Sequence, residues 1–234
     1  IALIDGITMG GGVGVSVHGS HRVATERTMF AMPETGIGLL PDVGGTYFLP
    51  RLPGEIGAWL VLTGARLLGA DAPAAGVATH YTASENIDAL KAALSEGGDV
   101  DAILAAHHHA AENEILPDHQ ADINRLFAGD SVAEIVAALA ADGSDWAQVQ
   151  AAAIATKSPT SAAVALRQMR DGMAVDFDEC MRIEMRAVTR IMAQADFYEG
   201  VRATILEKDG APNWTSQQDI DAIFAPLGDD ELVF

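Results

Sequence analysis

The sequence predicts an α/β fold, and three observations point to it. In residues 1–82, short apolar strands alternate with helical stretches, which is the pattern of an α/β domain. From residue 83 onward, apolar residues recur at spacings of three and four, as on the buried face of a helix. Apolar residues make up 49% of the 234 residues, which is enough for a substantial core.

The first 82 residues are rich in short elements. Glycines at 10–12 mark a turn. The composition of residues 13–17 also fits a strand, but we expect a helix because the glycines supply its start and small residues pack closely. Asp42 is expected to be the N-cap of a helix that runs toward Arg51. Asp71 is expected to cap a later helix, with Pro73 in its first turn. The predicted strands are 1–4, 22–25, 28–32 and 77–82, and the other predicted helices are 54–64 and 71–76.

The rest of the chain reads as helical. Residues 83–150 are rich in Ala, Asp and Glu, and we expect several helices there. Residues 155–234 continue as helices, and the apolar stripe that includes Met181, Met185 and Met192 is assigned to the core. We therefore divide the chain into 1–82, an α/β core segment, 83–154, a helical insertion, and 155–234, a helical C-terminal region.

The charge balance limits the partners. With 14 Lys and Arg against 33 Asp and Glu, the formal charge is −19, which argues against nucleic acid and anionic membranes. A single cysteine excludes an internal disulfide and fits a reducing compartment. No run of 18 apolar residues exists, so we expect no membrane span.

Two features of the first 45 residues suggest chemistry. The glycines Gly10, Gly11 and Gly12 are able to expose backbone N–H groups at a helix start, where they would bind an anion or an oxyanion, although a turn needed only for packing explains them as well. Glu34 follows an apolar strand and a proline, and a partly dry site would raise its pKa and suit it to act as a base or nucleophile. Taken alone, Glu34 is better explained as a solvated loop residue and Asp42 as a helix cap, although capping and a role in a pocket can coexist.

Other candidate motifs are weaker. The run His107–His109 is expected in a helix, where neighbouring side chains point about 100° apart and do not converge on one metal ion. Ser16 lies in a segment similar to a nucleophile elbow, but the fifth position is His18 rather than glycine, so we expect no serine triad.

Taken together, three motifs resemble the crotonase (enoyl-CoA hydratase/isomerase) superfamily: Ile-Asp-Gly-Ile-Thr-Met-Gly-Gly-Gly-Val-Gly at 4–14, Phe-Ala-Met-Pro-Glu-Thr at 30–35 and Gly-Leu-Leu-Pro-Asp-Val-Gly-Gly-Thr at 38–46. Lys-Ser-Pro-Thr-Ser at 157–161 and Asp-Phe-Tyr-Glu-Gly-Val-Arg-Ala at 196–203 fit as well. Within the superfamily, the chain is most similar to hydrolases of 3-hydroxyisobutyryl-CoA. The resemblance implies a spiral of strand–strand–helix units followed by a helical C-terminal region.

The resemblance also implies site residues. Gly11 matches the position whose N–H forms half of the oxyanion hole, flanked by Gly10 and Gly12, while Glu34 matches the catalytic glutamate. Asp42 matches an aspartate beside the acyl group. Hydratases carry a second glutamate where this chain has Gly14, which disfavours hydration.

The implied reaction is hydrolysis of a short β-hydroxyacyl-CoA thioester, most similar to 3-hydroxyisobutyryl-CoA hydrolysis in valine catabolism. An enoyl-CoA hydratase or isomerase, or a non-catalytic acyl-CoA-binding or assembly subunit, are the alternatives. We expect no metal or redox cofactor, an acyl-CoA as the small-molecule partner, and a bacterial cytoplasm, or mitochondria in a eukaryote; homo-oligomerisation is left open. The chain starts after the family's second oxyanion segment, so we expect residues 1–234 alone to be nearly inactive.

Overall fold

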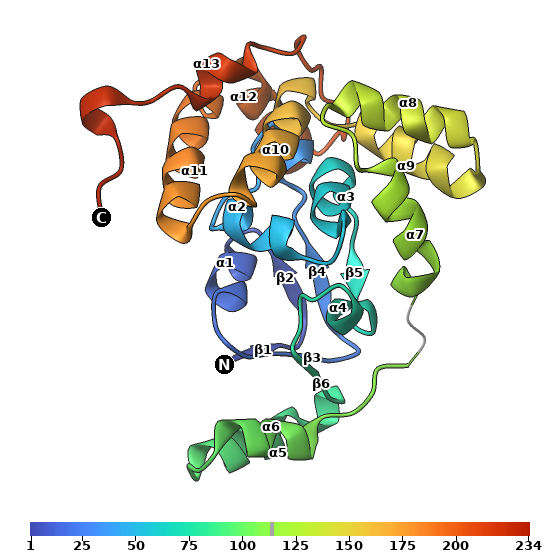
Figure 1. Ribbon diagram of the computed structural model, residues 1–234, viewed down its shortest axis with the longest axis vertical. Helices are drawn as coiled ribbons and strands as arrows, with labels where there is room; N and C mark the ends of the chain where they lie inside the picture. Colours follow the sequence, from blue (N-terminus) through green and yellow to red (C-terminus); the bar gives the residue numbers. More distant parts are fainter. Residues whose placement is uncertain (113–114) are drawn as a thin grey trace. The chain divides into compact units, whose positions relative to one another are not determined.

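The structure is a computed structural model, and it describes residues 1–112 and 115–234 (Figure 1). Its contacts form two compact units. Unit 1 comprises Ile1–Ala31 and Arg66–Ala121, and unit 2 comprises Met32–Ala65 and Asp122–Phe234. These units interleave along the chain, whereas the three predicted segments are contiguous, so that division stays a prediction.

Unit 1 contains two small sheets. In the first, β1, β3 and β6 are parallel in the order β1-β3-β6, with Leu3 opposite Val23. In the second, β2 is parallel to β4, and β4 is antiparallel to β5. The strands are β1 (Ala2–Ile4), β2 (Ile7–Met9), β3 (Arg22–Ala24), β4 (Met29–Ala31), β5 (Leu67–Leu68) and β6 (His80–Tyr81). The four strands predicted from sequence are confirmed, whereas β2 and β5 are additional strands. β5 has only two residues, which is too short to show an alternating pattern.

The segment around Asp71 departs from the expectation. The strand predicted over 77–82 begins only at His80, because the N–H groups of Val77 and Ala78 donate to the carbonyl of Ala72 in α4 (Asp71–Ala74). Asp71 does not cap α4, whose N-cap is Ala70. Its carboxylate instead accepts hydrogen bonds of 2.7 and 2.8 Å from the N–H groups of Ile115 and Leu116, at the start of α7 (Leu116–Leu126).

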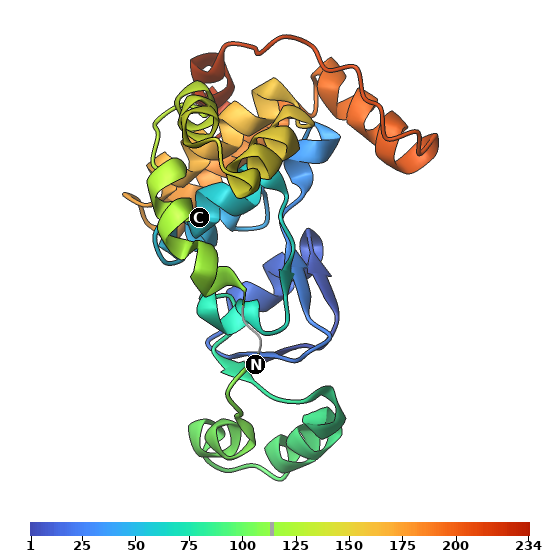
Figure 2. The same ribbon diagram turned by 90° about the vertical axis from the view of Figure 1, so that its right-hand side faces the viewer.

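The helices of unit 1 are short. The predicted helix after the glycines is confirmed as α1 (Gly11–Val17). Two further helices, α5 (Ile87–Ser95) and α6 (Val100–His107), lie side by side in both Figure 1 and Figure 2. Leu90 and Leu104 of this pair bury their side chains against Val23 of β3, which attaches the pair to the first sheet.

Unit 2 is a helical bundle around α10. In Figure 1, α3 and α10 pack together, with α8 and α9 on one side and α11 with α13 on the other. Leu40, Val164, Ala187, Ile191 and Ile223 form a buried apolar cluster among these elements. The α-helices are α2 (Gly45–Phe48), α3 (Ile56–Thr63), α8 (Val132–Asp142), α9 (Asp145–Ala155), α10 (Pro159–Gly172), α11 (Phe177–Ile191), α12 (Ala195–Val201) and α13 (Ile220–Phe224), and α7 continues into this unit.

Shorter helical turns complete the chain. They are the 3₁₀ turns η1 (Glu34–Ile37), η2 (Leu49–Arg51), η3 (Ser84–Asn86) and η5 (Gly228–Asp230), and the π-helical turn η4 (Arg202–Leu206). Residues 207–219 form no helix, so the expectation of a helical region up to residue 234 holds only in part. In the residues that the structure describes, no helix is both long and apolar enough to span a bilayer.

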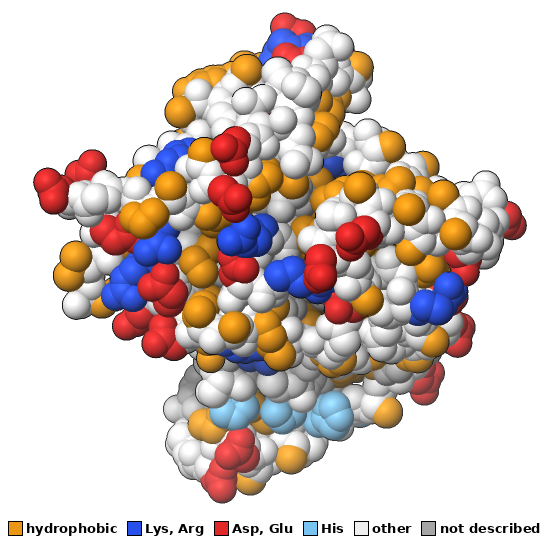
Figure 3. All heavy atoms as spheres, turned by 45° about the horizontal axis from the view of Figure 1, so that its top comes forward, with side chains coloured by type: hydrophobic (Ala, Val, Ile, Leu, Met, Phe, Trp, Pro, Cys, Tyr) orange, Lys and Arg blue, Asp and Glu red, His pale blue; other side chains and the backbone are white. Residues whose placement is uncertain are grey.

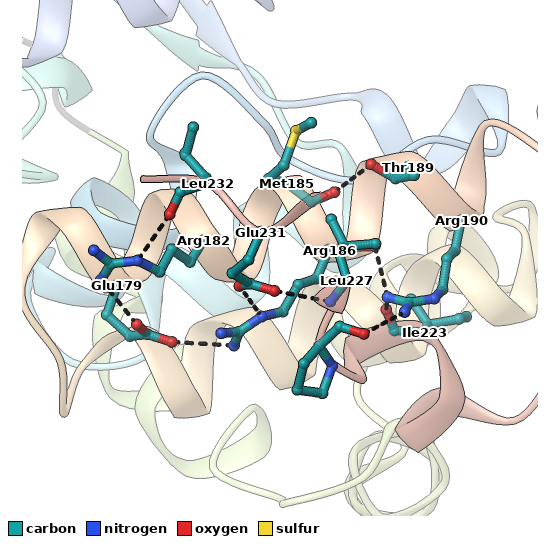
Figure 4. Close-up of polar contacts among 11 residues, drawn as sticks. Glu179, Arg182, Met185, Arg186, Thr189, Arg190, Ile223, Leu227, Glu231 and Leu232 are labelled. Atoms are coloured by element: carbon teal, nitrogen blue, oxygen red, sulfur yellow. Dashed lines mark hydrogen bonds and ion pairs between the residues drawn. The ribbon is translucent and has the colours of Figure 1, made fainter. Parts of the chain in front are cut away.

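The polar face of α11 is covered by the end of the chain (Figure 4). Arg186 Nε donates to Glu231 at 2.6 Å, and Arg182 Nε donates to the Leu232 carbonyl at 3.1 Å. The assignment of the methionine stripe to the core is wrong in part, because Met185 and Met192 are 40% and 46% exposed. The buried face of α11 is formed instead by Cys180, Ile183, Glu184, Ala187 and Ile191.

Candidate active site

Glu34 is a buried acidic residue of unit 2. It begins η1, directly after the exposed Pro33, yet its side chain is only 5% exposed. Within the described chain, its Oε2 atom has no hydrogen-bond partner. Because the side chain is buried, the interpretation of Glu34 as a solvated loop residue is wrong. A buried carboxyl oxygen without a hydrogen-bond partner is costly and is seldom kept for stability.

The turn that carries Glu34 is held from both sides. The Thr35 hydroxyl donates to the Val61 carbonyl of α3 at 2.9 Å, and the Thr35 carbonyl accepts from the Ser158 N–H at 3.2 Å. Two glycines allow α12 to come into direct contact with it. A Cβ on Gly38, whose φ is 69°, would lie 2.3 Å from the Asp196 carbonyl oxygen, and a Cβ on Gly200 would lie 2.3 Å from the Ile37 carbonyl carbon. No side chain fits at either position.

The buried Asp196 stabilises the contact between α12 and the Glu34 turn. Asp196 is 3% exposed, and its carboxylate accepts from the Ser158 hydroxyl at 2.6 Å and from the N–H and hydroxyl of Thr215 at 2.8 and 2.9 Å. Ser158 is in turn the N-cap of α10, since its Oγ accepts from the Ser161 N–H. Ser158 and Asp196 belong to the motifs at 157–161 and 196–203, and the sequence predicts no contact between them. The local signal in the sequence is Ser158 followed by Pro159, which is typical of a helix start.

The environment changes the acidity of Glu34. Burial raises its pKa from 4.5 to about 7; a backbone hydrogen bond within the same residue opposes the rise, and the negative charge of Asp42 adds to it. A carboxylate with a pKa near the working pH is the form best suited to accept a proton from water. The raised pKa that the sequence suggested for this residue agrees with the structure.

Asp42 lies in unit 2, as Glu34 does, and its side chain does not cap a helix. Its side chain is half-buried, and burial raises its pKa. The expectation that it caps the following helix is wrong: α2 has Gly44 as its N-cap residue with no side-chain cap, and only the Asp42 carbonyl takes part, accepting from the Gly45 N–H at 2.9 Å. The physical reason is that Val43 and Gly44 both have positive φ, 54° and 84°, which starts the helix two residues later.

The glycine turn lies in unit 1. Gly10 has φ 51° and ψ −125°, a conformation open in practice only to glycine, and α1 begins at Gly11. As the first residues of the helix, Gly11 and Gly12 have N–H groups without intrahelical acceptors. A Cβ on either residue would meet nothing within 4 Å, so packing in this chain does not require glycine there. Gly14 has no positive φ and lies inside α1.

The other candidate motifs lie in unit 1. Ser16 lies inside α1 and its hydroxyl donates to the Gly12 carbonyl at 2.6 Å, an arrangement unlike a nucleophile elbow. Of the predicted helical histidines, only His107 belongs to α6, because the chain leaves the helix at His108. Histidine side chains gather on the face drawn in Figure 3, and the rings of His21, His80 and His108 follow one another at 6.0 and 5.7 Å. In the described residues, no group of three or more potential ligands is arranged to hold a metal ion.

Comparison with known proteins identifies the family. A family model described as enoyl-CoA hydratase/isomerase matches residues 1–223. The chain belongs to the enoyl-CoA hydratase/isomerase family. Among curated proteins, it is 45% identical to the 3-hydroxyisobutyryl-CoA hydrolase, mitochondrial, of Xenopus tropicalis and 46% identical to that of Danio rerio, in each case over 99% of this chain and 65% of the relative. The protein of the same name from Homo sapiens is 43% identical over 100% of this chain and 65% of the relative. The chain thus spans about 65% of the length of these relatives.

Solved structures of the enoyl-CoA hydratase/isomerase family have the same fold. A carnitinyl-CoA dehydratase from Mycobacterium thermoresistibile matches with a TM-score of 0.91 and 41% identity, over 99% of this chain and 69% of that one. An enoyl-CoA hydratase from Rhodobacter sphaeroides 2.4.1 matches with a TM-score of 0.87 and the same identity and coverage. The predicted α/β fold of the crotonase type is thereby confirmed.

The buried Glu34 makes folding stability depend on pH. Because its pKa is raised from 4.5 to about 7 in the folded state, the stability linked to its proton is complete below about 4.5 and is lost as the pH rises through 7. Glu34→Gln removes this ionisation. We expect wild type to lose up to about 3 kcal/mol relative to Glu34→Gln between pH 4.5 and 8.

Urea unfolding of the two proteins across this range measures the difference. Glu96→Gln at an exposed position is the control and should follow wild type. Parallel curves for wild type and Glu34→Gln would show that Glu34 is not buried as described.

Proposed function

We propose that the protein hydrolyses a short β-hydroxyacyl-CoA thioester, with 3-hydroxyisobutyryl-CoA as its substrate. The observation that carries the proposal is Glu34, a buried carboxyl group with a pKa of about 7 and an oxygen without a partner in the described chain. The names of the curated relatives, all 3-hydroxyisobutyryl-CoA hydrolases, support this substrate.

In the proposed reaction, ionised Glu34 works in one of two ways. As a general base, it takes a proton from water while the water oxygen attacks the thioester carbonyl, and the CoA sulfur leaves and is protonated. As a nucleophile, it attacks the carbonyl itself and forms a mixed anhydride that water then hydrolyses. Both routes develop negative charge on the thioester oxygen, and we assign the Gly11 N–H, flanked by Gly10 and Gly12, as a donor to it.

Asp42 has a supporting role in this proposal. Its negative charge raises the pKa of Glu34, so it favours the uptake of a proton by that residue. A half-buried carboxylate is also able to accept a hydrogen bond from the substrate hydroxyl or to orient water. No metal or redox cofactor takes part in either route, and CoA enters as part of the substrate.

A second candidate function is hydration or isomerisation of an enoyl-CoA. The solved structures with the same fold carry the titles carnitinyl-CoA dehydratase and enoyl-CoA hydratase, each at 41% identity. Against hydration stands Gly14, where the resemblance places the second glutamate of hydratases. Asp42 leaves isomerisation open.

A thioester panel separates these candidates. The whole native protein should release CoA thiol from 3-hydroxyisobutyryl-CoA and leave enoyl thioesters unchanged. Glu34→Gln is nearly isosteric, so we expect it to keep substrate binding and to lose roughly 10²–10⁴-fold in turnover. Thiol release and loss of enoyl absorbance are measured in parallel. Hydration without thiol release would support the second candidate, and binding without turnover would support a non-catalytic acyl-CoA-binding subunit.

Gly14→Glu tests the position that separates hydrolases from hydratases. Because Gly14 has no positive φ and lies inside a helix, a glutamate is compatible with the backbone. We expect the variant to hydrate a short enoyl-CoA measurably and to lose hydrolysis through crowding near the acyl group. Val15→Glu puts the same charge on an 87% exposed neighbour and should behave as wild type. Unaltered hydrolysis in folded Gly14→Glu would show that residue 14 does not face the substrate.

A further inference from the structure

The segment Pro41–Thr46 of unit 2 is a turn with an unfavourable backbone. Val43 and Gly44 follow Asp42 with φ values of 54° and 84°. A left-handed conformation is unfavourable for a β-branched residue, and it persists only where neighbouring groups enforce it. Whatever enforces the turn therefore also decides where the Asp42 carboxylate lies.

Glu184 of α11 makes the principal contacts to this turn. Its side chain is 6% exposed, and both of its carboxylate oxygens are used. Oε2 accepts a hydrogen bond of 3.0 Å from the Gly44 N–H, and Oε1 accepts one of 2.8 Å from the Thr46 N–H. Glu184 thus supplies the cap of α2 that was expected from Asp42, although it lies 140 residues away from Gly44 in the sequence.

A second buried side chain holds the other end of the turn. Gln168 of α10 is fully buried, and its Nε2 donates to the Pro41 carbonyl at 3.0 Å and to the Thr46 hydroxyl at 2.8 Å. The Pro41 carbonyl and the N–H groups of Gly44 and Thr46 are therefore bonded to side chains of two packed helices. The Asp42 side chain takes no part in these bonds, which leaves its carboxylate available for another task.

The side chain that accepts from the Gly44 and Thr46 N–H groups is an ionisable one, Glu184. Burial raises the pKa of Glu184 to about 7, hydrogen bonds from Gly44 and Thr46 lower it, and the charge of Asp42 raises it further. Placing a second carboxylate near Asp42 is electrostatically unfavourable, and an uncharged side chain would avoid that cost. A carboxylate is the side chain that accepts from two backbone N–H groups without offering a donor.

We propose that Glu184 is a positioning residue for the hydrolysis proposed above: by bonding both Gly44 and Thr46, it fixes the turn that carries the Asp42 carboxylate. The inference rests on the proposed function. It assigns to Glu184 no contact with the substrate and no proton transfer. It predicts that changes at Glu184 affect catalysis only through Asp42.

Glu184→Gln is the direct test. The amide keeps one acceptor oxygen but turns an NH₂ group toward one of the two backbone N–H groups, so one hydrogen bond is lost. We expect kcat to fall roughly 10–100-fold, as for a small misplacement of a catalytic group, with KM changed by less than about twofold. Amide hydrogen exchange at Gly44 and Thr46 should become faster. Glu179→Gln on the same helix is the matched control, because Glu179 pairs with Arg182 and Arg186 rather than with the turn (Figure 4).

A double-mutant cycle with Asp42→Asn decides whether Glu184 acts through Asp42. If it does, Asp42→Asn with Glu184→Gln should be no slower than Asp42→Asn alone, because the positioned group is already absent. Multiplied losses in the double variant, or wild-type kcat in Glu184→Gln together with faster exchange at Gly44 and Thr46, would overturn the proposal.

A Glu184→Gln variant that does not fold and a wild-type protein without hydrolysis have different consequences. If Glu184→Gln does not fold, Glu184→Asp replaces it, since the shorter carboxylate keeps the charge but does not reach both amides; it should show the same fall in kcat and the same cycle. A wild-type protein without thioester hydrolysis would refute the proposed function. In that case, unchanged amide exchange in Glu184→Gln would separately refute the role of Glu184 in the turn.

Discussion

The burial of one carboxyl group, that of Glu34, is the constraint on which the rest of the candidate site depends. Its side chain is 5% exposed and one of its oxygens lacks a partner in the described chain, so the protein must prevent the turn around it from opening to water. Thr35, Ser158 and Asp196 do this with buried hydrogen bonds. Burial also gives Glu34 a pKa of about 7, and a carboxyl group with this pKa exchanges protons at neutral pH.

Two more acidic groups share this part of unit 2. The charge of Asp42 raises the pKa of both Glu34 and Glu184, so the proton affinities of the three groups are linked. Such an arrangement costs stability, and it persists because each group has separate support. Glu34 lies in a turn that is held by hydrogen bonds. Two backbone N–H groups donate to Glu184 and stabilise its charge, and Asp42 remains half-buried. Clusters of this kind are characteristic of functional sites.

The enoyl-CoA hydratase/isomerase family supports several reactions on one fold, so the reaction has to be argued from the site. Relatives named as hydrolases and solved structures titled as a dehydratase and a hydratase all match this chain at 41–46% identity. In the proposed function, we distinguish the reactions by which carboxylates are present. Gly14 lies in a helical backbone that would accept a glutamate, so the absence of a carboxylate there is not imposed by backbone strain.

The sequence by itself determined the family, the α/β fold, and most strands and helices of the first 82 residues, and it singled out Glu34 as a candidate site residue. These follow from local glycine and proline signals and from motifs that lie close together in the chain. Only the tertiary structure decided that Glu34 is buried, that Asp42 is not a helix cap, and that Glu184 and Gln168 hold the turn beside it. The last of these depends on contacts between residues more than 100 positions apart. A local pattern assigned the cap to the nearest aspartate, whereas the fold brought a carboxylate from α11 to the same N–H groups.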